Sequence, residues 1–227
     1  MFTTVESLVG SFTRDQLFAT SVMCTALSDQ GTIMHMSPAF AKLLKGPDAR
    51  PADHVGGNLT RVLGDRYGGE RIRLARHALD VNHPLICRSV IRGRQYVSHY
   101  HPAADSHEPD ARVAIIFHQV LEGPVNVSEF EHGEFIEAVN NDYGPLASLS
   151  RREVEVASLL SQGMDAKSIA AKLSRSLETI SSHKKSLFLK LGVDNQLEAA
   201  MIIRRAGLTE RDAPRIAAQQ RYGNVHQ

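Results

Sequence analysis

The spacing of apolar residues changes near residue 145. Before it, short apolar runs are separated by Gly, Asp and Asn turns, which is typical of strands mixed with a few helices. After it, apolar residues recur every three or four positions between helix-capping signals. The pattern predicts an α+β chain, with an N-terminal antiparallel sheet that has helices on one face and a C-terminal all-α domain of four helices.

Strands and helices alternate in the N-terminal part. A tight turn at Gly31 separates the first two strands, and Ser37-Pro38 opens the first helix. Three further strands complete a single sheet. The predicted elements are, in order, strands 22–27 and 32–36, helices 37–44 and 70–79, and strands 85–91, 95–101 and 112–121.

A linker is predicted between Gly123-Pro124 and Gly144-Pro145, because Gly-Pro and Asn/Asp clusters interrupt regular structure. Its apolar residues follow helical spacing loosely and predict a short acidic helix over 128–139. The predicted organisation is an N-terminal domain over 12–122, a linker with a short helix over 123–146, a helical domain over 147–209 and a tail over 210–227.

Capping residues open each helix of the C-terminal domain. Two of them start capping boxes, Ser150 with Glu153 and Asn195 with Glu198. The second and third helices meet at the three-residue corner 174–176, as a helix-turn-helix requires. The four capping residues are Ser150, Asp165, Ser176 and Asn195, and the helix-ending glycines are Gly163, Gly192 and Gly207.

The third of these helices has an apolar side and a polar side. At about 100° per residue, the residues predicted to face the other helices are Leu177, Ile180, Leu187, Phe188 and Leu191. Small hydroxyls and one lysine, Ser181, Ser182 and Lys185, lie opposite. Serine can pair with base edges and lysine with guanine or phosphate, so this side fits a DNA major groove. A solvated face of a small bundle has the same periodicity.

The residues of this domain also resemble a known family, the LuxR/GerE-type DNA-binding domain. The resemblance covers about 60 residues and rests on Leu149-Ser150-Arg151-Arg152-Glu153-Val154-Glu155-Val156, Gly163, Lys167, Ile169-Ala170, Leu173, Ser176, Thr179-Ile180, His183, Lys190-Leu191-Gly192-Val193 and Glu198-Ala199-Ala200. It implies that the third helix reads the major groove and the last helix dimerises. The implied base-reading residues are Ser181, Ser182 and Lys185, and the other implied DNA-binding residues are Lys167, Ser176, Thr179, Lys184 and Lys190.

Two positions depart from the pattern of that family. The family usually has a basic residue where Ser181 stands, so one charged groove contact is missing here. It usually has an aliphatic residue where Arg175 stands at the corner, and an arginine there can extend outward or touch phosphate.

In the N-terminal part, the order of strands and helices is joined by a run from Leu27 to Phe40 in which a Gly turn precedes a helix start. The order and the run resemble a PAS sensor domain, with Ser37 in place of the usual Asn. This resemblance implies a domain that binds a small molecule or cofactor between sheet and helices, or that dimerises.

Charge and composition narrow the class of protein. The formal net charge of +1 combines −4 over residues 1–148, +4 over 149–208 and +1 over 209–227. A basic module of this kind is expected to meet a polyanion.

No apolar run approaches the roughly 20 residues of a membrane helix and no secretory signal precedes the first domain, so we expect a cytoplasmic protein. Two cysteines, Cys24 and Cys87, are too few for a disulfide framework or a cysteine zinc site and are expected to be buried thiols.

Three histidines are the candidate ligands for a haem or a metal in the sensor. His99 and His101 are two apart on a predicted strand and share a face, and His77 lies on the helix 70–79. An isolated histidine is more often a hydrogen-bonded structural residue. The sequence therefore predicts no metal site and leaves the cofactor unknown.

A transcriptional regulator is the function that these features favour. A sensor domain would control a homodimer whose helix-turn-helix domains read two half-sites of double-stranded DNA, and the sensor would take a small-molecule ligand. The alternative is a regulator whose helical bundle docks on RNA polymerase or on another protein. An enzyme is not predicted, because no nucleophile elbow, phosphate loop or paired catalytic motif is found.

Overall fold

The computed structural model describes residues 23–104, 112–130 and 133–223. Residues 12–22 of the predicted N-terminal domain and 224–227 of the predicted tail lie outside these ranges. The described residues form two compact units that do not divide the sequence at a single point. The first unit holds 23–87, 97–104, 112–119, 130 and 133–140, and the second holds 88–96, 120–129 and 141–223. The predicted domain limits therefore stay predictions.

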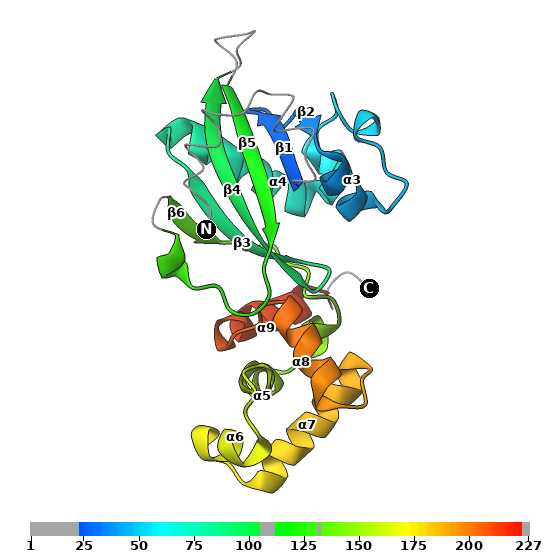
Figure 1. Ribbon diagram of the computed structural model, residues 1–227, viewed down its shortest axis with the longest axis vertical. Helices are drawn as coiled ribbons and strands as arrows, with labels where there is room; N and C mark the ends of the chain where they lie inside the picture. Colours follow the sequence, from blue (N-terminus) through cyan, green and yellow to red (C-terminus); the bar gives the residue numbers. More distant parts are fainter. Residues whose placement is uncertain (1–22, 105–111, 131–132, 224–227) are drawn as a thin grey trace. The chain divides into compact units, whose positions relative to one another are not determined.

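A six-stranded sheet has the strand order β2-β1-β5-β4-β3-β6 (Figure 1). Its strands are β1 (Met23–Ser28), β2 (Ile33–Met36), β3 (Leu85–Ile91), β4 (Arg94–Ala104), β5 (Arg112–Val120) and β6 (Glu134–Glu137). The turn between β1 and β2 contains Gly31 at φ +81°, a backbone conformation that glycine adopts readily. The five predicted strands are confirmed, although the predicted start at Val22 lies outside the described residues.

Helices α3 (Pro38–Lys45) and α4 (Leu59–Val81) pack on one face of this sheet, and a short 3-10 turn, η1 (Pro51–Asp53), lies between them in sequence (Figure 1). Ser37 caps α3, because its Oγ accepts from Phe40 N at 3.3 Å. The second helix is longer than the predicted 70–79. Gly64, at φ +78°, interrupts its helical backbone, so the regular part begins after that residue.

The predicted helix over 128–139 is wrong. The segment forms a 3-10 turn, η2 (Val127–Glu129), and then strand β6. Its apolar residues follow a period of two: Ile136 and Ala138 pack into the core, whereas Phe135 stacks on Phe130 with ring centroids 5.9 Å apart. The edge of β3 offers this segment backbone partners, and a partner far away in the sequence overrides weak helical spacing.

The sixth strand makes the sheet mixed rather than wholly antiparallel. Glu134 N donates to Pro84 O and Asp142 N donates to Val90 O, so the two segments run in the same direction. β1 is antiparallel to both β2 and β5, as predicted. The α+β class and the PAS-like order of strands and helices are confirmed, with a parallel strand added at the edge.

Four helices follow in the second unit, at the predicted places. They are α5 (Arg151–Ser161), α6 (Ala166–Leu173), α7 (Leu177–Leu191) and α8 (Gln196–Arg205), preceded by the 3-10 turn η3 (Gly144–Ser148). The side chain of each predicted capping residue accepts from a backbone N–H three residues on. The capping box is complete at Ser150 and Glu153, whereas at Asn195 the structure shows the forward bond alone. None of the described helices is long and apolar enough to cross a membrane.

A fifth helix, α9 (Ala213–Gly223), stands where the sequence predicted a tail. It follows the 3-10 turn η4 (Glu210–Asp212), and Ala213 and Ile216 are buried in the core of the second unit. The signals were present in the sequence. Thr209 and Asp212 form a capping box, and Pro214 stands in the first turn, where proline is tolerated.

A buried ion pair organises the second unit. The Arg88 guanidinium lies 3.0 Å from Asp212 Oδ1, and both side chains are almost wholly buried. The Arg88 side chain also donates to Gly207 O and to Gln95 Oε1, while Tyr143 Oη donates to Asp212 at 2.9 Å. Burial acts to raise the pKa of Asp212, but Arg88 and the other donors outweigh it and lower that pKa. The tip of the β3–β4 hairpin is thus fixed to the segment after α8.

Replacing Arg88 by Leu should destabilise the second unit by about 3–5 kcal/mol, because Asp212 would keep a buried charge without its partner. Urea unfolding followed by helical circular dichroism measures this. Arg151→Leu is the matched control. Arg151 is 78% exposed and pairs with Glu155 on the surface, so its loss should change the free energy of unfolding by less than about 1 kcal/mol. Equal effects of the two substitutions would contradict the assignment.

Candidate nucleic-acid interface

One side of α7 is exposed and polar, as its sequence predicts. Ile180, Leu187 and Leu191 are buried against the neighbouring helices. Ser181, Ser182 and Lys185 are exposed, and their side chains form no hydrogen bond or ion pair within the described ranges. Together they form a surface that we call the α7 outer face.

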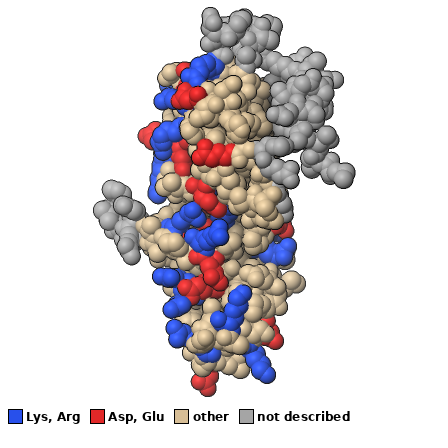
Figure 2. Space-filling view, turned by 90° about the vertical axis from the view of Figure 1, so that its left-hand side faces the viewer, with Lys and Arg blue, Asp and Glu red and all other residues tan. Residues whose placement is uncertain are grey.

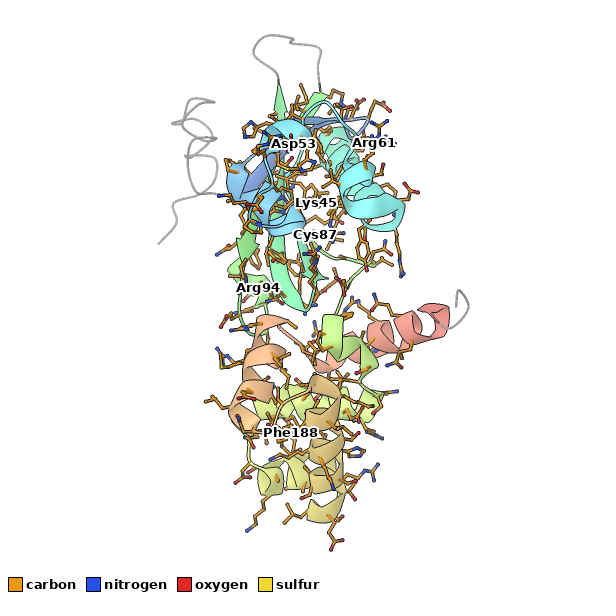
Figure 3. All side chains as sticks on the ribbon, turned by 90° about the vertical axis from the view of Figure 1, so that its right-hand side faces the viewer. Lys45, Asp53, Arg61, Cys87, Arg94 and Phe188 are labelled. Atoms are coloured by element: carbon orange, nitrogen blue, oxygen red, sulfur yellow. The ribbon has the colours of Figure 1, made fainter. Side chains whose placement is uncertain are left out.

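One apolar residue of α7, Leu177, differs from its predicted burial, whereas Leu189 lies on the side away from the core, as helical spacing predicts. Leu177 is 52% exposed, because it is the first residue of the helix and precedes the turn that packs on the core. Leu189 is 83% exposed and adds an apolar side chain to the outer face. Phe188 packs at the edge of the core, as expected, and is labelled in Figure 3.

The corner before α7 depends on an unusual backbone conformation. Ser174 is the C-cap of α6 at φ +52° and ψ +52°, in the left-handed region that few residues other than glycine adopt. Ser176 then caps α7: its Oγ accepts from Thr179 N at 3.1 Å and lies 2.9 Å from Thr179 Oγ1. Two of the predicted DNA-binding residues therefore hold the start of the helix.

Glu153 of α5 fixes α7 in place, which the sequence did not reveal. Its carboxylate accepts from Ser186 Oγ and from Lys190 Nζ, both at 2.6 Å, and also from Ser150 N at 2.6 Å. We call these four residues the Glu153 clasp. The capping-box motif predicted only the bond to Ser150, whereas the partners on α7 are more than 30 residues away.

Burial acts to raise the pKa of Glu153, but the hydrogen bonds from Lys190, Ser186 and Ser150 outweigh it and lower the pKa to about 2. The carboxylate therefore stays ionised at neutral pH and keeps the ammonium of Lys190 beside it.

The predicted phosphate-binding lysines differ in what they contact. Lys190 lies in the Glu153 clasp, and Lys184 Nζ donates to Gln196 Oε1 of α8 at 2.8 Å and lies 5.9 Å from the centre of the Phe188 ring. Lys167 is exposed in the first turn of α6. Lys167 and Lys185 are thus exposed, while the side chains of Lys184 and Lys190 hold α7 to α8 and α5.

Charge on the surface is mixed rather than continuous. Figure 2 shows one face of the molecule, on which Lys and Arg side chains alternate with Asp and Glu. A broad basic surface is absent from the part of that face that the structure describes. Contacts with a polyanion would then depend on particular side chains more than on the summed charge.

The histidine candidates do not come together in a ligand site. His77 Nε2 lies 3.3 Å from Glu134 Oε2, and its side chain is 46% exposed. His99 and His101 share a face of β4, as predicted, with parallel rings 6.4 Å apart, and His99 packs on Phe130. Burial lowers the pKa of His101 to about 4, so it is neutral at pH 7. Among the described residues, no group of three His, Cys, Asp or Glu side chains could hold a metal ion.

The helical part of the chain matches a known family of proteins. Residues 147–203 match the model described as "Bacterial regulatory proteins, luxR family". The second unit contains a luxR-family domain. The family is one of regulatory proteins, not of enzymes.

Two transcriptional regulatory proteins are similar to part of this chain. The chain is 51% identical over 49 residues to the transcriptional regulatory protein RcsB of Escherichia coli K12, which is 22% of this chain and 23% of RcsB. It is 48% identical over 52 residues to the transcriptional regulatory protein UhpA of the same organism, 23% of this chain and 26% of UhpA. The chain thus matches about a quarter of the length of these relatives. The chain is also similar to VqmA in the crystal structure of a Vibrio cholerae VqmA–ligand–DNA complex, with 15% identity and a TM-score of 0.48. This similarity covers 92% of this chain and 91% of VqmA.

The Glu153 clasp predicts how the luxR-family domain responds to acid. The pKa of Glu153 is lower in the folded protein than its ordinary value of 4.5, so the ionised carboxylate stabilises the fold at pH values above 4.5. This stabilisation is lost as the pH falls from about 5 towards 2. Glu153→Gln should lower the free energy of unfolding by roughly 1–3 kcal/mol at pH 7 and have a smaller effect at pH 3.

Urea unfolding at pH 7, 5, 4 and 3 measures this difference. Glu178→Gln, at an exposed position in the first turn of α7, is the control and should change stability little at each pH. A Glu153→Gln penalty that stays constant from pH 7 to pH 3 would exclude the clasp as its source.

Proposed function

We propose that the chain is a DNA-binding transcriptional regulator, in which the first unit is a sensor and the luxR-family domain binds double-stranded DNA. The observation that carries this proposal is the α7 outer face. A helix held rigidly by its buried side, with exposed serines and one unpaired lysine opposite, is the form that a major-groove reader takes.

Different side chains would serve recognition and attachment. Ser181, Ser182 and Lys185 would meet base edges, because they share the exposed face of α7. Lys167 and the region around Ser176 and Thr179 would meet the phosphate backbone, since the N-terminus of a helix attracts anions. Lys184 and Lys190 would add charge close to the backbone while keeping their present partners.

A homodimer is the proposed binding form. Leu197 and Met201 lie four residues apart on α8 and are 72% and 45% exposed, so one side of this helix carries unburied apolar surface. A second copy that covered it would place two α7 helices for two half-sites about one DNA turn apart.

Docking on RNA polymerase is the second candidate function. The observation that favours it is Leu189, an 83% exposed leucine on the α7 outer face that a protein groove would bury. In this case α7 would serve as a protein-binding helix.

Selection from a randomised duplex library, followed by fluorescence anisotropy of the full chain on the selected duplex, tests the proposal. The selected sites should contain two half-sites about 10 base pairs apart, and affinity should fall steeply with salt. Lys185→Ala should weaken specific binding roughly 5- to 150-fold and relax the preference at one base position.

Lys172→Ala is the matched control, because Lys172 is exposed in the last turn of α6 and lies outside the outer face of α7. It should leave the base preference unchanged. No enrichment of any sequence, together with polymerase capture that survives Lys185→Ala, would replace this proposal with the docking function.

A further inference from the structure

In one region of the first unit's core, three buried polar atoms have no hydrogen-bond partner among the residues that the structure describes. They are Arg71 Nη2 on α4, Tyr100 Oη on β4 and His118 Nε2 on β5, and all three atoms are buried. Arg71 is 6% exposed and Tyr100 is 0% exposed. A buried polar group without a partner destabilises a fold, so three in one region call for an explanation.

These groups face the same interior region. Tyr100 belongs to the core cluster between the sheet and its helices, together with Ile116 of β5 and Cys87 of β3, which Figure 3 labels. His118 is two residues beyond Ile116 and so points to the same face of the sheet, where its ring stacks on Phe40 of α3 at 4.0 Å.

Arg71 is close enough for its charge to act on both of the other groups. Burial lowers the pKa of His118, and the charge of Arg71 lowers it further, to about 3. Burial raises the pKa of Tyr100, and the charge of Arg71 partly offsets that rise. The histidine is therefore neutral and the tyrosine keeps its proton at neutral pH. Ser98 Oγ lies 2.9 Å from His118 Nδ1, and with this hydroxyl donating, Nε2 carries the proton. All three groups can then donate.

The charge of Arg71 is already balanced. Its Nη1 donates to Glu70 Oε2 at 3.0 Å, and the same carboxylate accepts from Val139 N at 2.7 Å and from Asn140 N at 3.0 Å. A further buried anion would leave this region with net negative charge in a medium of low dielectric. The missing partner is therefore an uncharged acceptor.

We propose that Arg71 Nη2, Tyr100 Oη and His118 Nε2 bind a small uncharged molecule through a carbonyl oxygen of the amide type. This inference rests on the proposed sensor function of the first unit. Two lone pairs on one carbonyl oxygen accept from two of the donors, and a second polar atom of the ligand meets the third. The rest of such a ligand would contact the apolar side chains around Phe40.

Binding of matched probes to the full chain, measured by isothermal titration calorimetry, tests this chemistry. Acetamide and benzamide carry the uncharged carbonyl, acetate and benzoate carry the charge, and toluene has neither. Binding of an amide in preference to its carboxylate and to toluene supports the proposal. Preference for a carboxylate overturns it, and so does the absence of binding by either amide, which leaves ordered water as the partner.

Tyr100→Phe separates binding from folding. Because Tyr100 Oη has no partner among the described residues, the substitution should leave the thermal midpoint of the free protein unchanged or raise it, while weakening amide binding roughly 3- to 10-fold. Tyr143→Phe is the matched control. Its hydroxyl donates to Asp212, so the substitution should lower the midpoint and leave amide affinity unchanged.

A Tyr100→Phe variant that loses stability but keeps amide affinity would overturn the assignment. DNA affinity measured without any probe shows whether the proposed amide site or the proposed regulatory function has failed. Tyr100→Phe should bind the selected duplex as the unmodified chain does, and loss of DNA binding in the unmodified chain itself would instead refute the regulator.

Discussion

The ion pair between Arg88 and Asp212 is the interaction on which the second unit depends. It joins residues 124 positions apart, and both side chains are almost wholly buried. The same guanidinium donates to Gly207 O. Glycine is favoured at this position, because its φ is +56° and a Cβ there would lie 2.1 Å from the Gln95 side chain. The buried charge of Arg88 is thus bonded to acceptors from several segments at once. Because moving any one segment would leave part of this charge without a partner, the segments are held together.

Buried polar groups serve opposite purposes in the two units. In the second unit, the bonds of Arg88, Asp212 and Glu153 are satisfied within the fold, which fixes the helices that carry the proposed DNA-binding side chains. In the first unit, Arg71 and Tyr100 have donors that meet no partner within the described part of the chain. A network in which every polar group is hydrogen-bonded makes a fold rigid, whereas a network with unpaired donors can bind a ligand that supplies the missing acceptors. This division matches a regulator built from a rigid reader and a sensor that responds.

The features that the sequence predicted were those with local causes. Ser150, Asp165 and Ser176 cap their helices through bonds that span three residues, so a short window of sequence reveals them. The exposed position of Lys185 followed from helical periodicity in the same way. The missed features have distant partners. Strand β6 forms because the edge of β3 is beside it, and Lys190 is drawn to Glu153 across 37 positions, although its charge alone indicated phosphate. The helix α9 was missed although it has a local signal, the capping box of Thr209 and Asp212.

The separation of Arg88 from Asp212 also has a consequence for synthesis of the chain. During translation Arg88 leaves the ribosome more than a hundred residues before its counter-ion exists. Contacts of such high sequence separation form late, because closing a long loop costs entropy before the contact can repay it. The hairpin tip must therefore remain hydrated until the segment after α8 arrives. The second unit acquires its final structure only after the segment that carries Asp212 has been made, and a nascent chain that ends before Asp212 has no carboxylate there for Arg88 to meet.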